Sequence, residues 1–102
     1  MIRFKYDNVD YSLGFNRKTA LATEKLGFVV TKLEDIPISG TLALFKGSFL
    51  MNHPMTAEDK IYEIFSKMSD KGELTRALYE EYSECLSTLT GDDEGNLGWT
   101  KE

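Results

Sequence analysis

The sequence predicts an α+β fold, in which an N-terminal β-hairpin packs on a bundle of about four α-helices in a single domain. Three observations lead to this prediction. Apolar and polar residues alternate over residues 2–15, apolar residues recur at helical spacing in four later segments, and the length of 102 residues suits one domain. We expect the domain to cover residues 1–90 and residues 91–102 to form a flexible acidic C-terminal tail.

The first segment is typical of two strands joined by a short turn. Every second side chain is apolar in IRFKY, residues 2–6, and in VDYSLGF, residues 9–15, and Asp7 and Asn8 between them are common turn residues. A period of two places the apolar side chains on one face of a hairpin. Two strands alone are marginally stable in water, so we expect this face to be buried against the rest of the chain.

The first helix is predicted to start after Asn16, because an asparagine side chain can accept a hydrogen bond from a free backbone N–H of the first turn. It covers RKTALATEKL and ends at Gly27, a residue type that suits the left-handed position after a helix. The following FVVTKLEDIP is rich in β-branched residues. It predicts an extended connection, which can include a third strand, closed by Pro37.

The next helix is predicted over residues 40–51, with Ser39 as its N-cap. Its apolar residues leave only narrow polar strips, which is typical of a central helix or of one shared with a partner. The helix is expected to end before Pro54, because the residue preceding a proline disfavours helical geometry.

Two acidic helices complete the predicted bundle. One begins with Thr56 as its cap and Asp59 at the third position, and its apolar stripe comprises Ala57, Ile61, Ile64, Phe65 and Met68. The last begins at Asp70, with Glu73 at the third position, and ends near residue 89. Its stripe comprises Leu74, Ala77, Leu78, Cys85 and Leu89, widened on one flank by Tyr79, Tyr82 and Leu86.

The residues predict no catalytic, metal or cofactor site. Cys85 falls on an apolar stripe, where a free cysteine behaves as a small hydrophobe, and His53 follows a helix end, where an imidazole usually caps carbonyls or faces solvent. Neither has a second ligand at zinc spacing. The tail acids fail the EF-hand pattern, because Thr90 and Lys101 occupy two ligand positions. We expect a protein that is not an enzyme and takes no small-molecule substrate.

The charge is unevenly distributed along the chain. The net charge is −5; residues 1–37 hold six basic and five acidic residues, whereas residues 38–102 hold six and twelve. The acidic half argues against nucleic acid as a partner, because phosphate contacts need clustered cations. No apolar run approaches the ~20 residues of a membrane span, and the N-terminus lacks the apolar core of a signal peptide. A lone cysteine suits a reducing compartment, so we expect a cytosolic protein.

Two features favour a protein–protein surface. The flank of the last helix combines aromatic residues with neighbouring acids, and the polar tail contains the chain's only tryptophan. The candidate partner-binding residues are therefore Tyr79, Tyr82, Leu86, Leu97 and Trp99. For the flank, the alternative is that these side chains close the core. For Trp99, the alternative is that the ring docks on its own domain.

A series of short motifs runs through the whole chain. In order they are FKYDNVDYSLGFNRKT, LGF at a helix end, LEDIP, an apolar helix with LFKGSF and HP, and EGNLGW in the tail. With these motifs the sequence resembles the small tail assembly chaperones of long-tailed phages (siphophages) that infect Gram-positive bacteria. The family has no catalytic residues that could be carried over to this chain.

The resemblance implies a non-catalytic role in binding and shielding the tape measure protein while tail-tube subunits assemble around it. It also implies the cytoplasm of the infected host, absence from the mature virion, and contacts with the tail-tube protein and with further copies of the chain. The alternative is a small acidic phage regulator or inhibitor that binds a host protein. A mimic of DNA would need acids in two rows, whereas the predicted acids lie mostly on one helix face.

Overall fold

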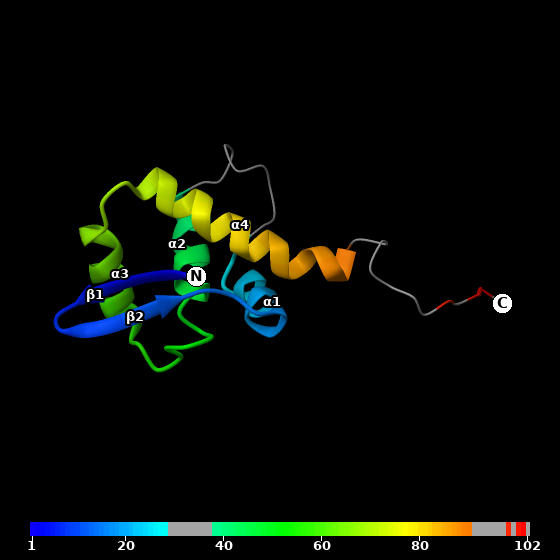
Figure 1. The fold of residues 1–102 in the computed structure, drawn as a ribbon, viewed down its shortest axis with the longest axis horizontal. Coiled ribbons are helices and arrows are strands. Elements are labelled where there is room, and N and C mark those ends of the chain that lie inside the picture. Colours follow the sequence, from blue (N-terminus) through cyan, green and yellow to red (C-terminus); the bar gives the residue numbers. More distant parts are fainter. Residues whose placement is uncertain (29–37, 91–97, 99, 102) are drawn as a thin grey trace.

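The alternating run at the N-terminus forms the predicted hairpin. In the computed structural model, β1 (Ile2–Tyr6) pairs antiparallel with β2 (Val9–Leu13), and the register runs from Ile2 opposite Leu13 to Tyr6 opposite Val9 (Figure 1). Asp7 and Asn8 form the turn with φ angles of 50° and 65°. Positive φ at both positions defines a turn whose twist matches that of the flanking strands, and Asp and Asn tolerate it better than most residues.

The structure describes residues 1–28, 38–90, 98, 100 and 101, without the side chains of residues 88–90. Four predictions lie outside these residues. They are the extended connection or third strand closed by Pro37, the place of Leu89 on an apolar stripe, the flexible character of the tail, and the partner contacts of Leu97 and Trp99.

One face of the hairpin packs against the core, as predicted, and it is fully buried at two residues of β2. Tyr11 and Leu13 of β2 belong to the core, and Ile2, Phe4 and Tyr6 of β1 pack against it while staying half-buried. Val9 is the exception, because its side chain next to the turn is 47% exposed. Val9 lies next to the turn at the tip of the hairpin, where the apolar face of the hairpin extends beyond the core.

Both predicted ends of the first helix are confirmed. In α1 (Arg17–Lys25), Asn16 Oδ1 accepts from the Thr19 N–H at 2.8 Å, and Thr19 Oγ1 accepts from the Asn16 N–H at 2.9 Å. These reciprocal bonds satisfy two backbone donors that a helix start leaves unpaired. Gly27 follows the helix with φ of 102°, a conformation that glycine adopts without steric cost.

The next helix, α2 (Ile38–Gly47), differs from its prediction at both ends. It already includes Ser39, so this residue is not the N-cap. It also ends at Gly47 instead of residue 51, and residues 48–52 form turns. The physical reason is a tertiary contact, because the Ser48 carbonyl accepts a hydrogen bond from the Gly14 N–H at 3.1 Å. A continuing helix would have used this carbonyl itself.

The last two helices are α3 (Glu58–Lys67) and α4 (Lys71–Thr90). Ala57 is the N-cap of α3 and makes no side-chain cap bond, so the prediction of Thr56 as the cap is wrong by one residue. The start of α4 is confirmed. Asp70 Oδ1 accepts from the Glu73 N–H at 3.4 Å, which is a weak version of the expected cap.

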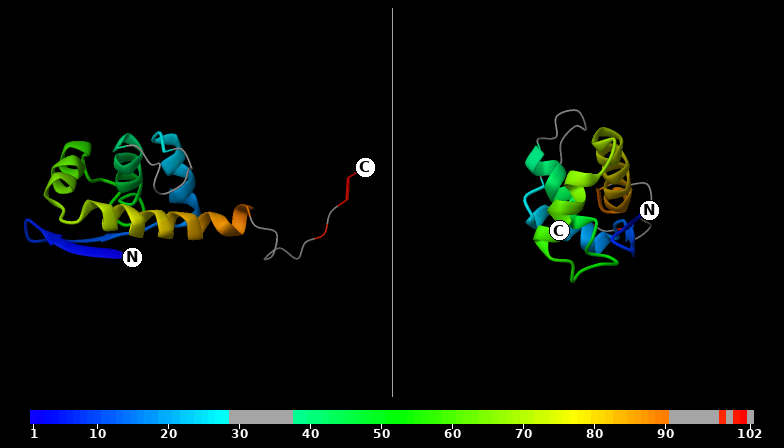
Figure 2. Two further views of the ribbon diagram at one scale, coloured as in Figure 1. Left: turned by 90° about the horizontal axis from the view of Figure 1, so that it is seen from above. Right: turned by 90° about the vertical axis from the view of Figure 1, so that its left-hand side faces the viewer.

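The helices form two groups in space. α1, α2 and α3 stand side by side in a row, and α4 runs along this row (Figure 2). The hairpin lies beside α4 on the same side of the row (Figures 1 and 2). The hairpin and the four helices thus make the single packed α+β domain that the sequence predicts.

The core is centred on α2 and is rich in aromatic rings. Leu44, Phe45 and Phe49 are essentially inaccessible to solvent, which confirms a central position for this apolar segment. Phe49 contacts the rings of Phe45 and Tyr11 at centroid distances of 5.2 and 5.8 Å. Such edge-to-face contacts stabilise a core beyond the area that they bury. The segment after α2 therefore ties the hairpin to the helices.

Candidate partner-binding surface

Tyr82 of α4 lies in the core and not on a partner-binding surface. Its side chain is 1% exposed, and its ring contacts those of Phe15 and Phe28 at centroid distances of 5.6 and 5.0 Å. The hydroxyl donates to Glu24 Oε1 at 3.2 Å. Burial, and then the charge of Glu24, raise the pKa of the Tyr82 hydroxyl. For this residue the alternative is correct, because the flank of the helix closes the core here.

The neighbouring positions Cys85 and Leu86 are half-buried and pack against the core. The Cys85 thiol donates to the Phe15 carbonyl at 3.2 Å, and burial raises the pKa of this thiol. A higher pKa lowers the thiolate fraction, so the group is a poor nucleophile. Cys85 is therefore the structural residue that the apolar stripe predicts.

Tyr79 is the flank residue that borders a hollow at the surface of α4. It is half-buried against the core, and the hollow of about 490 Å³ is lined by Tyr79, Glu80, Ser83, Glu84 and Ser87. An aromatic ring beside two carboxylates can contact an apolar side chain of a partner and a cation next to it. Of the residues predicted on the flank, Tyr79 thus has the placement that suits partner binding best.

The two predicted tail contacts, Leu97 and Trp99, lie outside the residues that the structure describes. The other three predicted residues, Tyr79, Tyr82 and Leu86, lie on one flank of α4. The structure separates them by burial, since Tyr82 is inside and the other two are half-buried.

Polar contacts fix the tip of the hairpin on α3. Lys60 Nζ lies 2.8 Å from Asp7 Oδ2 and 3.3 Å from Glu63 Oε2, and the Tyr6 hydroxyl donates to Glu63 Oε2 at 2.6 Å. The hydrogen bonds from Tyr6 and Lys60 lower the pKa of Glu63, and the bond to Glu63 raises the pKa of Tyr6. The ammonium also lies 4.9 Å from the centroid of the Tyr6 ring.

His53 has a role that sequence reasoning missed. Its Nε2 accepts a hydrogen bond from the Ser12 N–H at 3.0 Å, and its ring lies 5.0 Å from that of Tyr11. The sequence around His53, between a helix end and a proline, does not indicate this contact, because Ser12 lies 41 residues away in the chain. His53 therefore acts as a cap for the edge of a strand and not for a helix.

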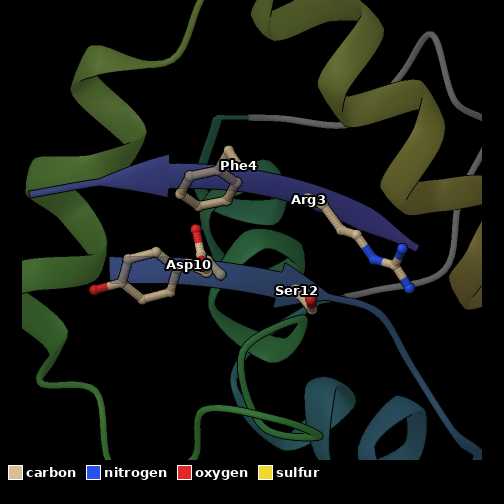
Figure 3. Close-up of a pocket in the computed structure, with 5 residues that line it drawn as sticks. Arg3, Phe4, Asp10 and Ser12 are labelled. Atoms are coloured by element: carbon tan, nitrogen blue, oxygen red, sulfur yellow. The ribbon is translucent and has the colours of Figure 1, made fainter. Parts of the chain in front are cut away.

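A second hollow, of about 310 Å³, lies on the hairpin. It is lined by Arg3, Phe4, Asp10, Tyr11 and Ser12. Figure 3 shows the Arg3 side chain pointing along the strand and away from Asp10. Lys5 approaches Asp10 only at 4.0 Å, and both side chains are well exposed, so this pair contributes little to stability.

A third hollow, of about 300 Å³, lies where α2 begins beside α3 and α4. It is lined by Ile38, Thr41, Phe65, Lys71, Gly72 and Thr75. Ile38 is 80% exposed there.

Over the described part of the chain, no group of three or more His, Cys, Asp or Glu side chains lies close enough together to bind a metal ion. No helix in the same part is long and apolar enough to cross a membrane.

Comparison with curated proteins and with solved structures returned no match. A family model does match, and the match covers residues 1–102. The family is described as a domain of unknown function, and that description assigns no activity, ligand or partner. The protein is therefore a member of the DUF5055 family over its whole length.

Proposed function

We propose that this protein is a siphophage tail assembly chaperone, which binds and shields the tape measure protein while the tail tube assembles. The observation that carries the proposal is the order of short motifs along the whole chain, from FKYDNVDYSLGFNRKT to EGNLGW. The proposed role is non-catalytic, and the proposed place of action is the cytoplasm of the infected bacterium. The protein would then leave the assembly before the virion is complete.

Two properties of the domain support a role in shielding an apolar client. The hollow beside Tyr79 offers an aromatic ring at the surface of α4, with Glu80 and Glu84 next to it. The net charge of −5 would keep a complex with an apolar client in solution, because like-charged complexes repel one another. The proposed client contacts are Tyr79, Leu86, Leu97 and Trp99; Tyr82 is left out because its ring is buried.

Co-expression with the tape measure protein tests this proposal. We expect the wild-type protein to keep the tape measure protein in the soluble fraction and to copurify with it. Tyr79→Ala and Trp99→Ala should each reduce copurification, whereas Tyr62→Ala, at an exposed tyrosine of α3, should not. A tape measure protein whose solubility does not depend on co-expression would refute the proposed function.

The position of the gene separates this proposal from the alternative of an acidic regulator or inhibitor of a host protein. A chaperone gene is expected between the major tail protein gene and a very long tape measure gene. An isolated gene among early lytic functions would favour the regulator. Many copies along one client also predict self-association, which sedimentation over a range of concentrations would detect.

A further inference from the structure

The two outer edges of the hairpin differ in how their backbone groups are satisfied. At Ser12 of β2, the N–H donates to His53 and the carbonyl accepts from Asn52 Nδ2 at 3.1 Å. Just after the strand, the Gly14 N–H donates to the Ser48 carbonyl. The segment 48–53 therefore covers this edge at Ser12 and, just beyond the strand, at Gly14. Where the edge is covered, it cannot pair with another strand.

Among the described residues, none covers the edge of β1 in this way. The backbone N–H and C=O groups of Ser12 point away from β1. In an antiparallel pair, the same groups of its partner Arg3 must then point away from β2, and those of Lys5, opposite Asp10, do so as well. Within the described part of the chain, the backbone N–H and C=O groups of Arg3 and Lys5 have no hydrogen-bond partner. These groups have the spacing at which an antiparallel strand exchanges hydrogen bonds.

The apolar face of the hairpin is also incompletely covered along β1. Tyr11 and Leu13 on β2 are buried, whereas Phe4 and Tyr6 on β1 are only half-buried, although they occupy the same face. Figures 1 and 3 show the helices behind the hairpin, in which β1 is one of the two edge strands. A further strand next to β1 would place its own inward side chains over Phe4 and Tyr6.

The charges along β1 indicate which kind of strand fits. Arg3 and Lys5 are exposed on the opposite face, and Arg3 makes no ion pair with a described residue. If β1 of a second copy paired antiparallel with this edge, Arg3 and Lys5 would face Arg3 and Lys5 of the other copy. Like charges directly opposite each other destabilise a sheet, whereas acidic side chains there would stabilise it. A second copy is thus a poor occupant.

We propose that the open edge of β1 binds an extended segment of another protein as a third, antiparallel strand. The segment alternates acidic and apolar residues. Its acidic side chains lie opposite Arg3 and Lys5, and its apolar side chains cover Phe4 and Tyr6. This surface is separate from the hollow beside Tyr79, and the inference does not depend on the proposed function.

Short synthetic peptides that alternate Glu and Val test the proposal on the full chain. We expect saturable binding, with slower amide hydrogen exchange at Arg3 and Lys5 in NMR spectra, because these amides become hydrogen-bonded. A peptide of the same sequence with N-methyl groups on the edge-facing amides should not bind, since it cannot form the ladder. A peptide with Lys in place of Glu should bind more weakly.

Charge reversal at Arg3 and Lys5 tests the same contact from the side of the protein. Arg3→Glu combined with Lys5→Glu should weaken binding of the Glu/Val peptide by about tenfold or more and strengthen binding of the Lys/Val peptide. Lys18→Glu combined with Lys25→Glu makes the same change of net charge on the exposed side of α1 and should leave both affinities nearly unchanged. Circular dichroism would verify that both variants fold.

Three results would overturn the inference. They are the absence of binding by the Glu/Val peptide, binding that persists after N-methylation, and an affinity that does not respond to the reversal at Arg3 and Lys5. Protection of the Arg3 and Lys5 amides that grows with protein concentration in the absence of peptide would show that a second copy occupies the edge. That result would also overturn the inference.

Discussion

The imidazole of His53 accepts a hydrogen bond from the backbone N–H of Ser12 at 3.0 Å and thereby caps the outer edge of β2. The Nε2 atom must be unprotonated to accept this bond. The same side chain packs against Tyr11, so one residue covers a polar edge and an aromatic ring at once. The hairpin is therefore held by the segment after α2 through both its backbone and its buried face.

Replacement of His53 should destabilise the protein by leaving the Ser12 N–H without a partner. We expect His53→Phe, which retains an aromatic ring but cannot accept, to lower the free energy of unfolding by about 1–3 kcal/mol. Urea denaturation followed by circular dichroism measures this change. Met55→Ala, at a side chain that is 92% exposed, should change it by less than about 0.5 kcal/mol. Equal effects of the two substitutions would show that the hydrogen bond contributes nothing.

The crossing of α1 and α2 depends on Gly47. A Cβ atom at this position would collide with the side chain of Thr23, which is fully buried. We expect Gly47→Ala to destabilise the protein by about 1–3 kcal/mol, because the helices would have to separate. Differential scanning calorimetry would show the loss as a lower Tm.

Two further variants make the Gly47 test specific. Gly72→Ala in the first turn of α4 meets no atom within 4 Å and should leave stability unchanged or raise it slightly. Thr23→Ala combined with Gly47→Ala should recover part of the loss, because the smaller side chain makes room. Strictly additive effects of Thr23→Ala and Gly47→Ala would contradict the proposed collision.

Tyr82 should make the fold sensitive to alkaline pH. Burial and the charge of Glu24 raise the pKa of its hydroxyl, so folding favours the neutral phenol. This contribution is fully present below the unfolded pKa of about 10 and is lost as the pH rises above it. We expect the urea midpoint of the wild type to fall more steeply above pH ~10 than that of Tyr82→Phe. Identical slopes for the two proteins would refute the prediction.

The contacts at the hairpin tip should respond to acid and to salt. Hydrogen bonds from Tyr6 and Lys60 lower the pKa of Glu63, so its contribution is present above the unfolded pKa and is lost as the pH falls below it. Glu63→Gln should therefore flatten the loss of stability on acidification. Because these side chains are exposed, the difference should shrink at high ionic strength. A difference that is unaffected by salt would exclude an electrostatic origin.

Local signals in the sequence predicted much of the fold correctly. Asp7-Asn8 between two alternating runs predicted the hairpin, Asn16 and Gly27 marked the ends of α1, and Asp70 marked the start of α4. Each of these features depends on residues within a few positions of one another. Backbone preferences and neighbouring donors suffice to specify them, so distant parts of the chain are not needed.

The candidate site was predicted less completely. A helical wheel shows that Tyr79, Tyr82 and Leu86 point to one flank of α4, but it does not show how far the core extends around the helix. Phe15 and Phe28, more than fifty residues earlier, enclose Tyr82 and leave Tyr79 at the edge of a hollow. The i, i+4, i+8 spacing of Leu74, Leu78 and Tyr82 was the available sign that this ring belongs to the core.

The sequence by itself determined the order and type of the elements, because periodicity, caps and turn residues act locally. The tertiary structure alone decided where α2 ends, which tyrosine is buried, and which edge of the hairpin stays open. In each case the reason is a contact between distant segments. The Gly14 N–H donates to the carbonyl of Ser48, and segment 48–53 covers the backbone of β2 at Ser12, whereas no described residue covers the edge at Arg3 and Lys5.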